Sequence, residues 1–178
     1  ELTLDKLEQL NPRYIFFPHW SEKISKEIFE RYECVCFHET DLPFGKGGSP
    51  IQNLINKGFE KTKISALKMI EELDSGPIYL KRNLSLYGLA EEIYIRSAKI
   101  VFEMIEKIIT EDLQPKMQDG ISTSFKRRNP SQSLIPKEID SLKELFDFIR
   151  MLDAEDYPSA KLIYYDFLLE ITRPALRT

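Results

Sequence analysis

The sequence predicts an α/β fold, with an open, mostly parallel sheet in the first part of the chain and a small α+β segment after it. Short apolar runs typical of strands alternate with helical patterns along the first 112 residues. Strands that are separated by helices of this length usually pair in parallel through right-handed crossovers. The chain has 178 residues, 42% of them apolar and 30% charged, which is enough to bury a core and typical of a globular domain.

The first elements follow from leucine spacing and from a continuous apolar run. Leucines at every third position predict a short helix within 2–10. The run at 13–20 predicts a fully buried strand that Pro18 ends. Ser21 is placed to cap a helix over 22–32.

The next elements surround a glycine-rich stretch. A second short strand is predicted at 34–37, and a helix is predicted to begin at Pro50 and to end just before Gly58. Residues 61–70 and 76–86 alternate well enough to predict two further strands, joined by a turn.

The rest of the chain predicts two helices and a terminal pair of strands. In order, we expect a long helix over 88–112, a turn-rich segment over 113–136, a helix over 141–152 and two short strands over 160–174. We therefore divide the chain into a core of 1–112 and a C-terminal extension of 113–178.

Composition and charge argue against several classes of protein. No apolar run approaches the roughly 20 residues that a membrane span requires, and the first residues lack the regions of a signal peptide, so we expect a cytoplasmic protein with no membrane partner. The net charge of −4 argues against a nucleic-acid partner, although the segment 125–128, "FKRR", is a local basic patch. Cys34 and Cys36 are too close for an easy disulfide and too few for a zinc site, so no metal is expected.

The glycine-rich stretch "GKGGSP" at 45–50 raises the question of phosphate binding. It has neither the G-x-G-x-x-G spacing nor the P-loop pattern, in which glycines lead directly into a helix. An ordinary turn is therefore the better interpretation.

His38 is more informative because it follows a strand. Strand alternation places Cys34, Cys36 and His38 on one face, at the carboxyl end where open α/β sheets bind ligands. A buried structural histidine is the alternative. Downstream, Asp74 before Ser-Gly is most often a turn residue. Beside His38, the Asp74 carboxylate would orient the imidazole, but spacing alone does not show that the two residues meet.

A longer pattern joins these residues. From His38 the chain follows H-x-x-x-L-P-x-x-x-G-G-x-P-I, and "ALKMIEELDSGPIY" with Asp74 lies downstream. These segments resemble the catalytic segment of the formyltetrahydrofolate-dependent formyltransferases, which include sugar N-formyltransferases and methionyl-tRNA formyltransferases. The similarity continues through "SFKRRNPSQSLIP" and covers most of residues 12–165. It implies a Rossmann-like sheet, of which the family has several strands and helices before the equivalent of 13–20.

The resemblance also implies a mechanism and site residues. In the family, an asparagine, a histidine and a distant aspartate transfer a formyl group from 10-formyltetrahydrofolate, the cosubstrate, to an amine. His38 takes the histidine's role and stabilises the oxyanion as an imidazolium, and Asp74 takes the aspartate's role. The residues implied to line the cofactor are Thr40, Asp41, Leu42, Pro43 and Trp20. Those implied to contact the substrate are Gly47, Gly48, Arg127 and Arg128.

Several of these residues have simpler alternatives. Trp20, which with His19 follows the first strand, could instead pack on the next helix. Arg127 and Arg128, implied to hold a pyrophosphate, could form a solvated basic patch or structural ion pairs. Where the family has asparagine this chain has Cys36, a poor hydrogen-bond donor. Losing one oxyanion donor typically costs about 10²–10³ in rate.

Two functions from different classes are therefore expected. The first is N-formylation of a small amine, with a nucleotide-linked amino sugar as the favoured acceptor. The second is a formyltransferase-like protein that binds folate or a partner without catalysis. Methionyl-tRNA formylation and formyltetrahydrofolate hydrolysis are further enzyme alternatives. The terminal strands within 160–174 could pair between copies in a homodimer.

Overall fold

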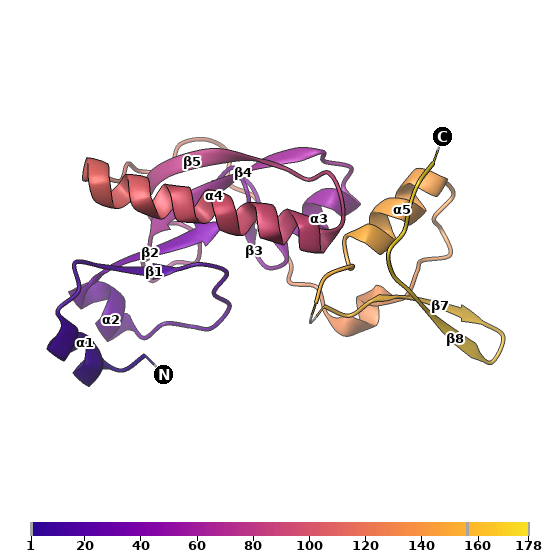
Figure 1. Ribbon diagram of the computed structural model, residues 1–178, viewed down its shortest axis with the longest axis horizontal. Helices are drawn as coiled ribbons and strands as arrows, with labels where there is room; N and C mark the ends of the chain where they lie inside the picture. The colour runs from indigo at the N-terminus through magenta and orange to yellow at the C-terminus, as the bar shows by residue number, and fades with distance from the viewer. Residues whose placement is uncertain (1, 156, 178) are drawn as a thin grey trace.

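A computed structural model describes residues 2–155 and 157–177 (Figure 1). In chain order its elements are α1 (Leu4–Leu10), β1 (Tyr14–Phe17), α2 (Lys26–Arg31), β2 (Glu33–His38), β3 (Lys46–Gly47), α3 (Pro50–Asn56), β4 (Lys61–Lys68), β5 (Ile78–Ser85), α4 (Ala90–Glu111), β6 (Ser124–Phe125), the 3-10 helix η1 (Pro130–Ser133), α5 (Leu142–Arg150), β7 (Ala160–Tyr164) and β8 (Phe167–Ile171). Figure 1 shows α1 and α2 at one end of the molecule and α5 with the β7–β8 hairpin at the other.

The α/β class is confirmed, and the main sheet is mixed. Its strand order is β1-β2-β4-β5, in which β1 and β2 are parallel. The pairs β2–β4 and β4–β5 are antiparallel, so the parallel order expected from strand and helix alternation holds only for the first pair of these strands. Helix α3 does not carry the chain back across the sheet: its seven residues are about 10 Å long, whereas the six residues of β2 span about 20 Å. The chain therefore enters β4 at the same end of the sheet at which it left β2.

Strand β2 sends alternate side chains into two apolar clusters. Val35 and Phe37 belong to a large cluster formed with α3, α4 and α5. Cys34 belongs to a smaller cluster with α1 and α2, against which Cys36 packs. The predicted alternation along this strand is therefore confirmed, and the sheet has an apolar layer on each face.

The long helix α4 secures the larger layer. Ile93, Met104 and Ile108 are fully buried, as their helical spacing predicts. Burial of each such side chain contributes about 1.5–3 kcal/mol. The helix therefore holds β4 and β5 in place and, through them, one wall of the site described below.

Two predictions near the N-terminus were wrong. Strand β1 is half-buried rather than fully buried, with Phe17 as its one buried residue, because it lies at the edge of the four-stranded sheet. Ser21 does not cap α2, which begins four residues later than predicted, with Ser25 at its N-cap position. The residues between β1 and α2 instead form a loop that lines a cavity.

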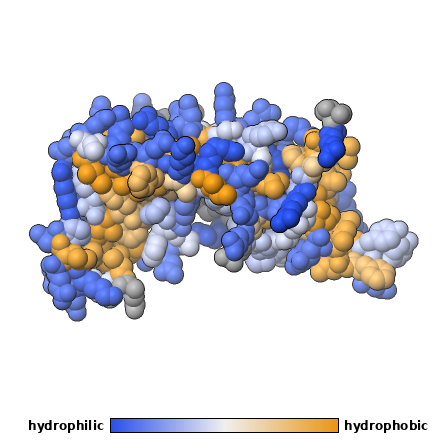
Figure 2. Space-filling view, in the orientation of Figure 1, coloured by the Kyte–Doolittle hydropathy of each residue, from blue (hydrophilic) through white to orange (hydrophobic). Residues whose placement is uncertain are grey.

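The segment after α4 combines an expected hairpin with an unexpected strand. β7 and β8 pair antiparallel, as predicted for the terminal strands. Within the turn-rich segment, β6 pairs with β3 of the glycine stretch, a contact between residues far apart in the chain. The hairpin exposes a run of apolar side chains, which belong to the apolar surface at one end of the molecule in Figure 2. The division at residue 112 stays a prediction.

None of the helices in the described part of the chain is long and apolar enough to cross a membrane.

Candidate functional site

His38 and Asp74 meet at the end of β2. The two side chains are 9% and 11% exposed, and His38 Nδ1 lies 3.7 Å from Asp74 Oδ2. His38 Nε2 lies 2.8 Å from the carbonyl oxygen of Gly45. The structure therefore brings together the two residues whose contact the sequence spacing left open.

The backbone around Asp74 is tightly held. Asp74 has a positive φ of 52°, and Gln118 Nε2 donates to the carbonyl oxygens of Asp74 and Gly76 at 2.8 and 2.9 Å. A Cβ at Gly76 would lie within 3.0 Å of the Lys68 carbonyl oxygen, so the turn presses directly against the end of β4. These contacts hold the carboxylate over His38.

The glycine stretch frames this pair of side chains. The Gly47 amide donates to Asp74 Oδ2 at 2.8 Å, while Gly45 faces His38. Gly47 and Gly48 lie so close to Phe125 and Arg127, respectively, that a Cβ at either position would come within 3.0 Å of them. The turn interpretation fits this geometry better than a phosphate cradle, because the Gly47 amide is already used to hold a carboxylate.

Cys36 lies on the same wall, two residues before His38. Burial, and secondly the charge of Asp74, raise the pKa of the Cys36 thiol to about 12. Its sulfur lies 3.7 Å from the carbonyl oxygen of Leu67. Cys36 is therefore a neutral thiol at pH 7, and a weak donor.

These residues line a cavity of about 850 Å³, within the range of small-molecule sites. The predicted site residues that line it are Trp20, Cys36, His38, Gly47, Gly48, Asp74 and Arg127. Those that do not line it are Thr40, Asp41, Leu42, Pro43 and Arg128. The cavity walls come from the loop after β1, the end of β2, the glycine stretch and the turn that holds Asp74.

The predicted cofactor segment lies behind the cavity wall. Thr40 and Leu42 are fully buried. Asp41 is held by Lys63 and Lys81 at 2.8 and 2.5 Å. Burial alone would raise the pKa of Asp41, but the hydrogen bonds from both lysines hold it below its ordinary value. The role of this segment in cofactor binding stays a prediction, and the Asp41 carboxylate already has two structural partners.

The two predicted arginines differ. Arg128 donates its backbone amide to Ser49 Oγ at 3.1 Å and its guanidinium to the Gln132 carbonyl oxygen at 2.5 Å. The guanidinium lies over the Phe148 ring, and burial lowers the pKa of Arg128. Arg127 reaches the cavity. Arg127 is therefore the better candidate for an anionic part of a substrate.

Sequence reasoning missed several polar residues that line the same cavity, among them Glu39, Gln52 and Tyr94. Gln52 Nε2 donates to Tyr94 Oη at 2.8 Å, and Glu39 pairs with His19. Gln52 and Tyr94 lie on α3 and α4, where nothing in the helical pattern marks them. The one signal for Glu39 is its position directly after His38. Within residues 2–155 and 157–177, no group of three or more metal ligands is found.

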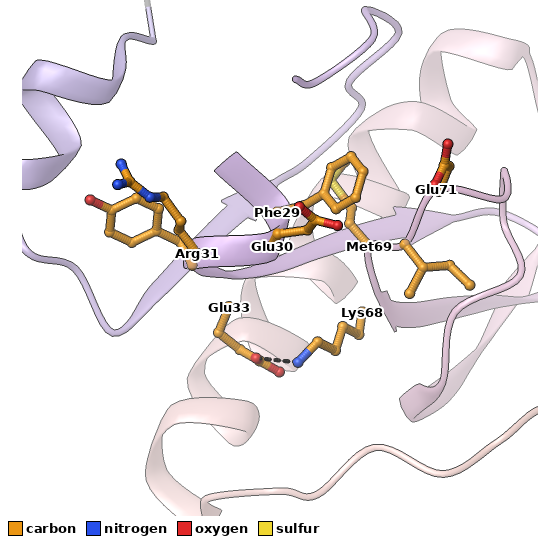
Figure 3. Close-up of a pocket in the computed structure, with 9 residues that line it drawn as sticks. Phe29, Glu30, Arg31, Glu33, Lys68, Met69 and Glu71 are labelled. Carbon is orange, nitrogen blue, oxygen red and sulfur yellow. Dashed lines mark hydrogen bonds and ion pairs between the residues drawn. The ribbon is translucent and has the colours of Figure 1, made fainter. Parts of the chain in front are cut away.

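A smaller hollow of about 380 Å³ lies beside the main cavity, between residues 29–33 and 68–71 (Figure 3). Its charged groups already have partners: Lys68 Nζ lies 2.6 Å from Glu33 Oε2. It contains no histidine and none of the predicted site residues. The main cavity is therefore the candidate site.

Comparisons with known proteins agree with one family. Residues 130–178 match a family model described as the C-terminal domain of methionyl-tRNA formyltransferase. A solved methionyl-tRNA formyltransferase from Clostridium thermocellum is 51% identical, with a TM-score of 0.95, over 99% of this chain and 78% of that one. A sugar N-formyltransferase from Shewanella is 16% identical with a TM-score of 0.73, over 93% of this chain and 71% of that one, and shows the fold alone.

Curated sequences give a similar picture. A methionyl-tRNA formyltransferase from Thermodesulfovibrio yellowstonii is 27% identical over 155 residues, which are 83% of this chain and 50% of the relative. The chain thus spans about half the length of the curated relatives it matches.

Proposed function

The chain belongs to the formyltransferase family, and from this premise we propose that it transfers a formyl group from 10-formyltetrahydrofolate to a primary amine. The observation that supports this most directly is the contact of His38 with Asp74 beside an 850 Å³ cavity. A histidine and a carboxylate whose side chains are only 9% and 11% exposed are suited to stabilising a tetrahedral intermediate of acyl transfer.

The chemistry needs a donor for a negative oxygen. The amine attacks the formyl carbon, and the carbonyl oxygen becomes an oxyanion. When the intermediate collapses, the bond to the folate nitrogen breaks. The attacking nitrogen loses one proton and the folate nitrogen gains one, so the products are a neutral formamide and tetrahydrofolate. The gap of 3.7 Å between His38 Nδ1 and Asp74 exceeds a hydrogen bond. The imidazolium N–H is therefore available to the oxyanion, while Asp74 supplies a compensating charge.

A nucleotide-linked amino sugar is the acceptor that we favour. Arg127 offers a cation for a pyrophosphate. Ser49 and Tyr157 add hydroxyls to the cavity wall, 3.3 Å apart, which suit the polyhydroxyl surface of a sugar.

Methionyl-tRNA is a second acceptor, supported by the names of the 51% and 27% identical relatives. The expectation that nucleic acid is not a partner is therefore not supported. An aminoacyl ester also presents a primary amine, so the same His38 chemistry would apply to both acceptors.

The test mixes the protein and formyltetrahydrofolate with either acceptor and follows release of tetrahydrofolate. We expect turnover with one acceptor and its loss in His38→Ala and in Asp74→Ala. The exposed Asp166 on the terminal hairpin provides a matched control, since Asp166→Ala removes a carboxylate that does not line the cavity and should keep turnover. Absence of turnover with both acceptors would contradict the transferase proposal.

Two further outcomes separate the remaining alternatives. Release of formate and tetrahydrofolate without any amine would indicate a hydrolase. Folate binding without turnover would indicate a formyltransferase-like binding protein. Restoration of turnover in Cys36→Asn would then show that the missing amide at this position causes the loss of catalysis. The neutral thiol of Cys36 motivates this variant.

A further inference from the structure

A second histidine and carboxylate pair lines the same cavity as His38 and Asp74. His19 Nδ1 lies 3.0 Å from Glu39 Oε1, and the Glu39 side chain is 10% exposed. His19 comes from the loop after β1 and Glu39 directly follows β2, so two separate segments bring the pair together. His19 has a φ of 50°, in the left-handed region that only a few per cent of non-glycine residues occupy.

The contact with Glu39 fixes the hydrogen-bonding state of the imidazole. A carboxylate can only accept, so neutral His19 donates from Nδ1 and keeps Nε2 as an acceptor. Nε2 forms no hydrogen bond with the described residues. The His19 side chain is one-third exposed, and the Tyr94 ring packs edge-on against it with centroids 6.0 Å apart. The imidazole is thus held in place with one basic nitrogen unused.

The proposed reaction has a proton that His38 does not account for. An aliphatic amine with a pKa near that of an α-amino group, about 7.7–8.0, is largely an ammonium ion at pH 7. An ammonium ion has no lone pair and does not attack a carbonyl carbon. In the mechanism above, His38 acts as an imidazolium and Asp74 offsets its charge, so neither is free to take this proton.

We propose that His19, oriented by Glu39, is the base that deprotonates the acceptor ammonium. This inference rests on the proposed function. In the step, the R–NH₃⁺ proton moves to Nε2 of His19 and the N–H electron pair becomes the lone pair that attacks the formyl carbon. Glu39 stabilises the resulting imidazolium, and the proton passes to water after product release. No oxidant or other reactant is needed.

The electrostatics of the pair agree with this role. The hydrogen bond from His19 to Glu39 raises the pKa of the imidazole, which burial alone would lower. A base works best when its pKa lies near the working pH. The other charged or titratable groups that line the cavity are Glu22, Lys23, Lys26, Cys36, His38, Lys68, Glu71, Glu72, Asp74, Tyr94, Arg127 and Tyr157.

The experiment is a pH profile of kcat for the intact protein at saturating substrates. His19→Asn should lower kcat by about 10²–10⁴, the usual contribution of a general base, and added imidazole should restore part of it. Glu39→Gln should move the acid limb to lower pH, because the group that raises the pKa of His19 loses its charge. The acceptor's own pKa is common to all variants, so the differences report on the protein. Glu103→Gln, on the exposed face of α4, is the control that should keep the wild-type profile.

Three results distinguish the outcomes. If wild-type protein transfers no formyl group, the proposed function fails. If the wild type is active and His19→Asn loses activity with an unchanged pH profile and no rescue by imidazole, His19 is structural and the inference is overturned. Circular dichroism and tetrahydrofolate binding report on the fold, and if His19→Asn unfolds, the folded Glu39→Gln variant decides: an acid limb that does not move also overturns the inference.

Discussion

Replacing Gly47 with alanine tests whether the glycine stretch is held as tightly as its contacts indicate. Gly47 has a φ of 97°, and a Cβ there would lie within 3.0 Å of the Phe125 carbonyl oxygen. Gly58 has a φ of 77°, and nothing lies within 4 Å of a Cβ placed there. Alanine at Gly58 would therefore have the same unfavourable backbone conformation as alanine at Gly47, but no steric overlap. The left-handed conformation costs about 1–2 kcal/mol for either alanine. The overlap adds about 1–3 kcal/mol for Gly47→Ala alone, because a backbone oxygen cannot rotate away.

Urea unfolding measures both costs. We expect Gly58→Ala to lose about 1–2 kcal/mol of unfolding free energy and Gly47→Ala about 2–5 kcal/mol, with equal m-values. Gly47→Ala should also lose turnover, because its amide holds Asp74. Equal destabilisation of the two variants would refute the argument, since it would mean that β3 and β6 separate at no cost.

Three other predictions follow from charged groups. Asp74→Asn should lower kcat by about 10²–10⁴ without unfolding the protein, since the amide oxygen can still accept from Gly47; wild-type tetrahydrofolate release would contradict this. Asp147→Ala should cost about 3–5 kcal/mol in urea, because it leaves Arg150, only 6% exposed, without its carboxylate; a loss under 1 kcal/mol would show that backbone carbonyls suffice for the guanidinium. Burial alone would raise the pKa of Glu33, but hydrogen bonds from Lys68 and Tyr79 lower it below the ordinary 4.5. The ionised Glu33 carboxylate therefore stabilises the folded protein fully above pH 4.5, and this contribution is lost as pH falls through the lowered pKa. In Glu33→Gln, the unfolding free energy should therefore depend less steeply on pH below 4.5.

Local patterns predicted most of the elements. Pro50 begins α3 as expected, and the alternation of Cys34 and Val35 along β2 matches the two apolar layers. Both depend on neighbouring residues alone. The direction of β4 could not be predicted this way, because it depends on how far α3 carries the chain across the sheet. The cap of α2 failed for a similar reason: the residues around Ser21 form a wall of the cavity instead of a helical turn.

The site was partly predictable. His38 and Asp74 could be selected because a strand end and a turn mark them, and their contact supports the pairing. The contact between Gln52 and Tyr94 depends on how α3 packs against α4, and the position of Gln118 depends on a long loop. Sequence spacing predicts neither. The cofactor segment is a different case: the resemblance selected residues 40–43, and in the structure they lie outside the cavity lining, with Thr40 and Leu42 buried and Asp41 paired with Lys63.

Cys36 links the chemistry to the fold. An amide at this position would add an oxyanion donor worth about 2.7–4 kcal/mol, whereas a buried thiol whose pKa is raised to about 12 remains neutral and donates weakly. The nearby Gly47 amide is committed to Asp74. In the proposed reaction, stabilisation of the oxyanion therefore falls mainly to His38. A nitrogen that donates its N–H to the oxyanion cannot also accept the proton of the acceptor ammonium ion. In the proposed mechanism, two histidines, each beside its own carboxylate in one cavity, divide these tasks: His38 donates to the oxyanion and His19 accepts the ammonium proton.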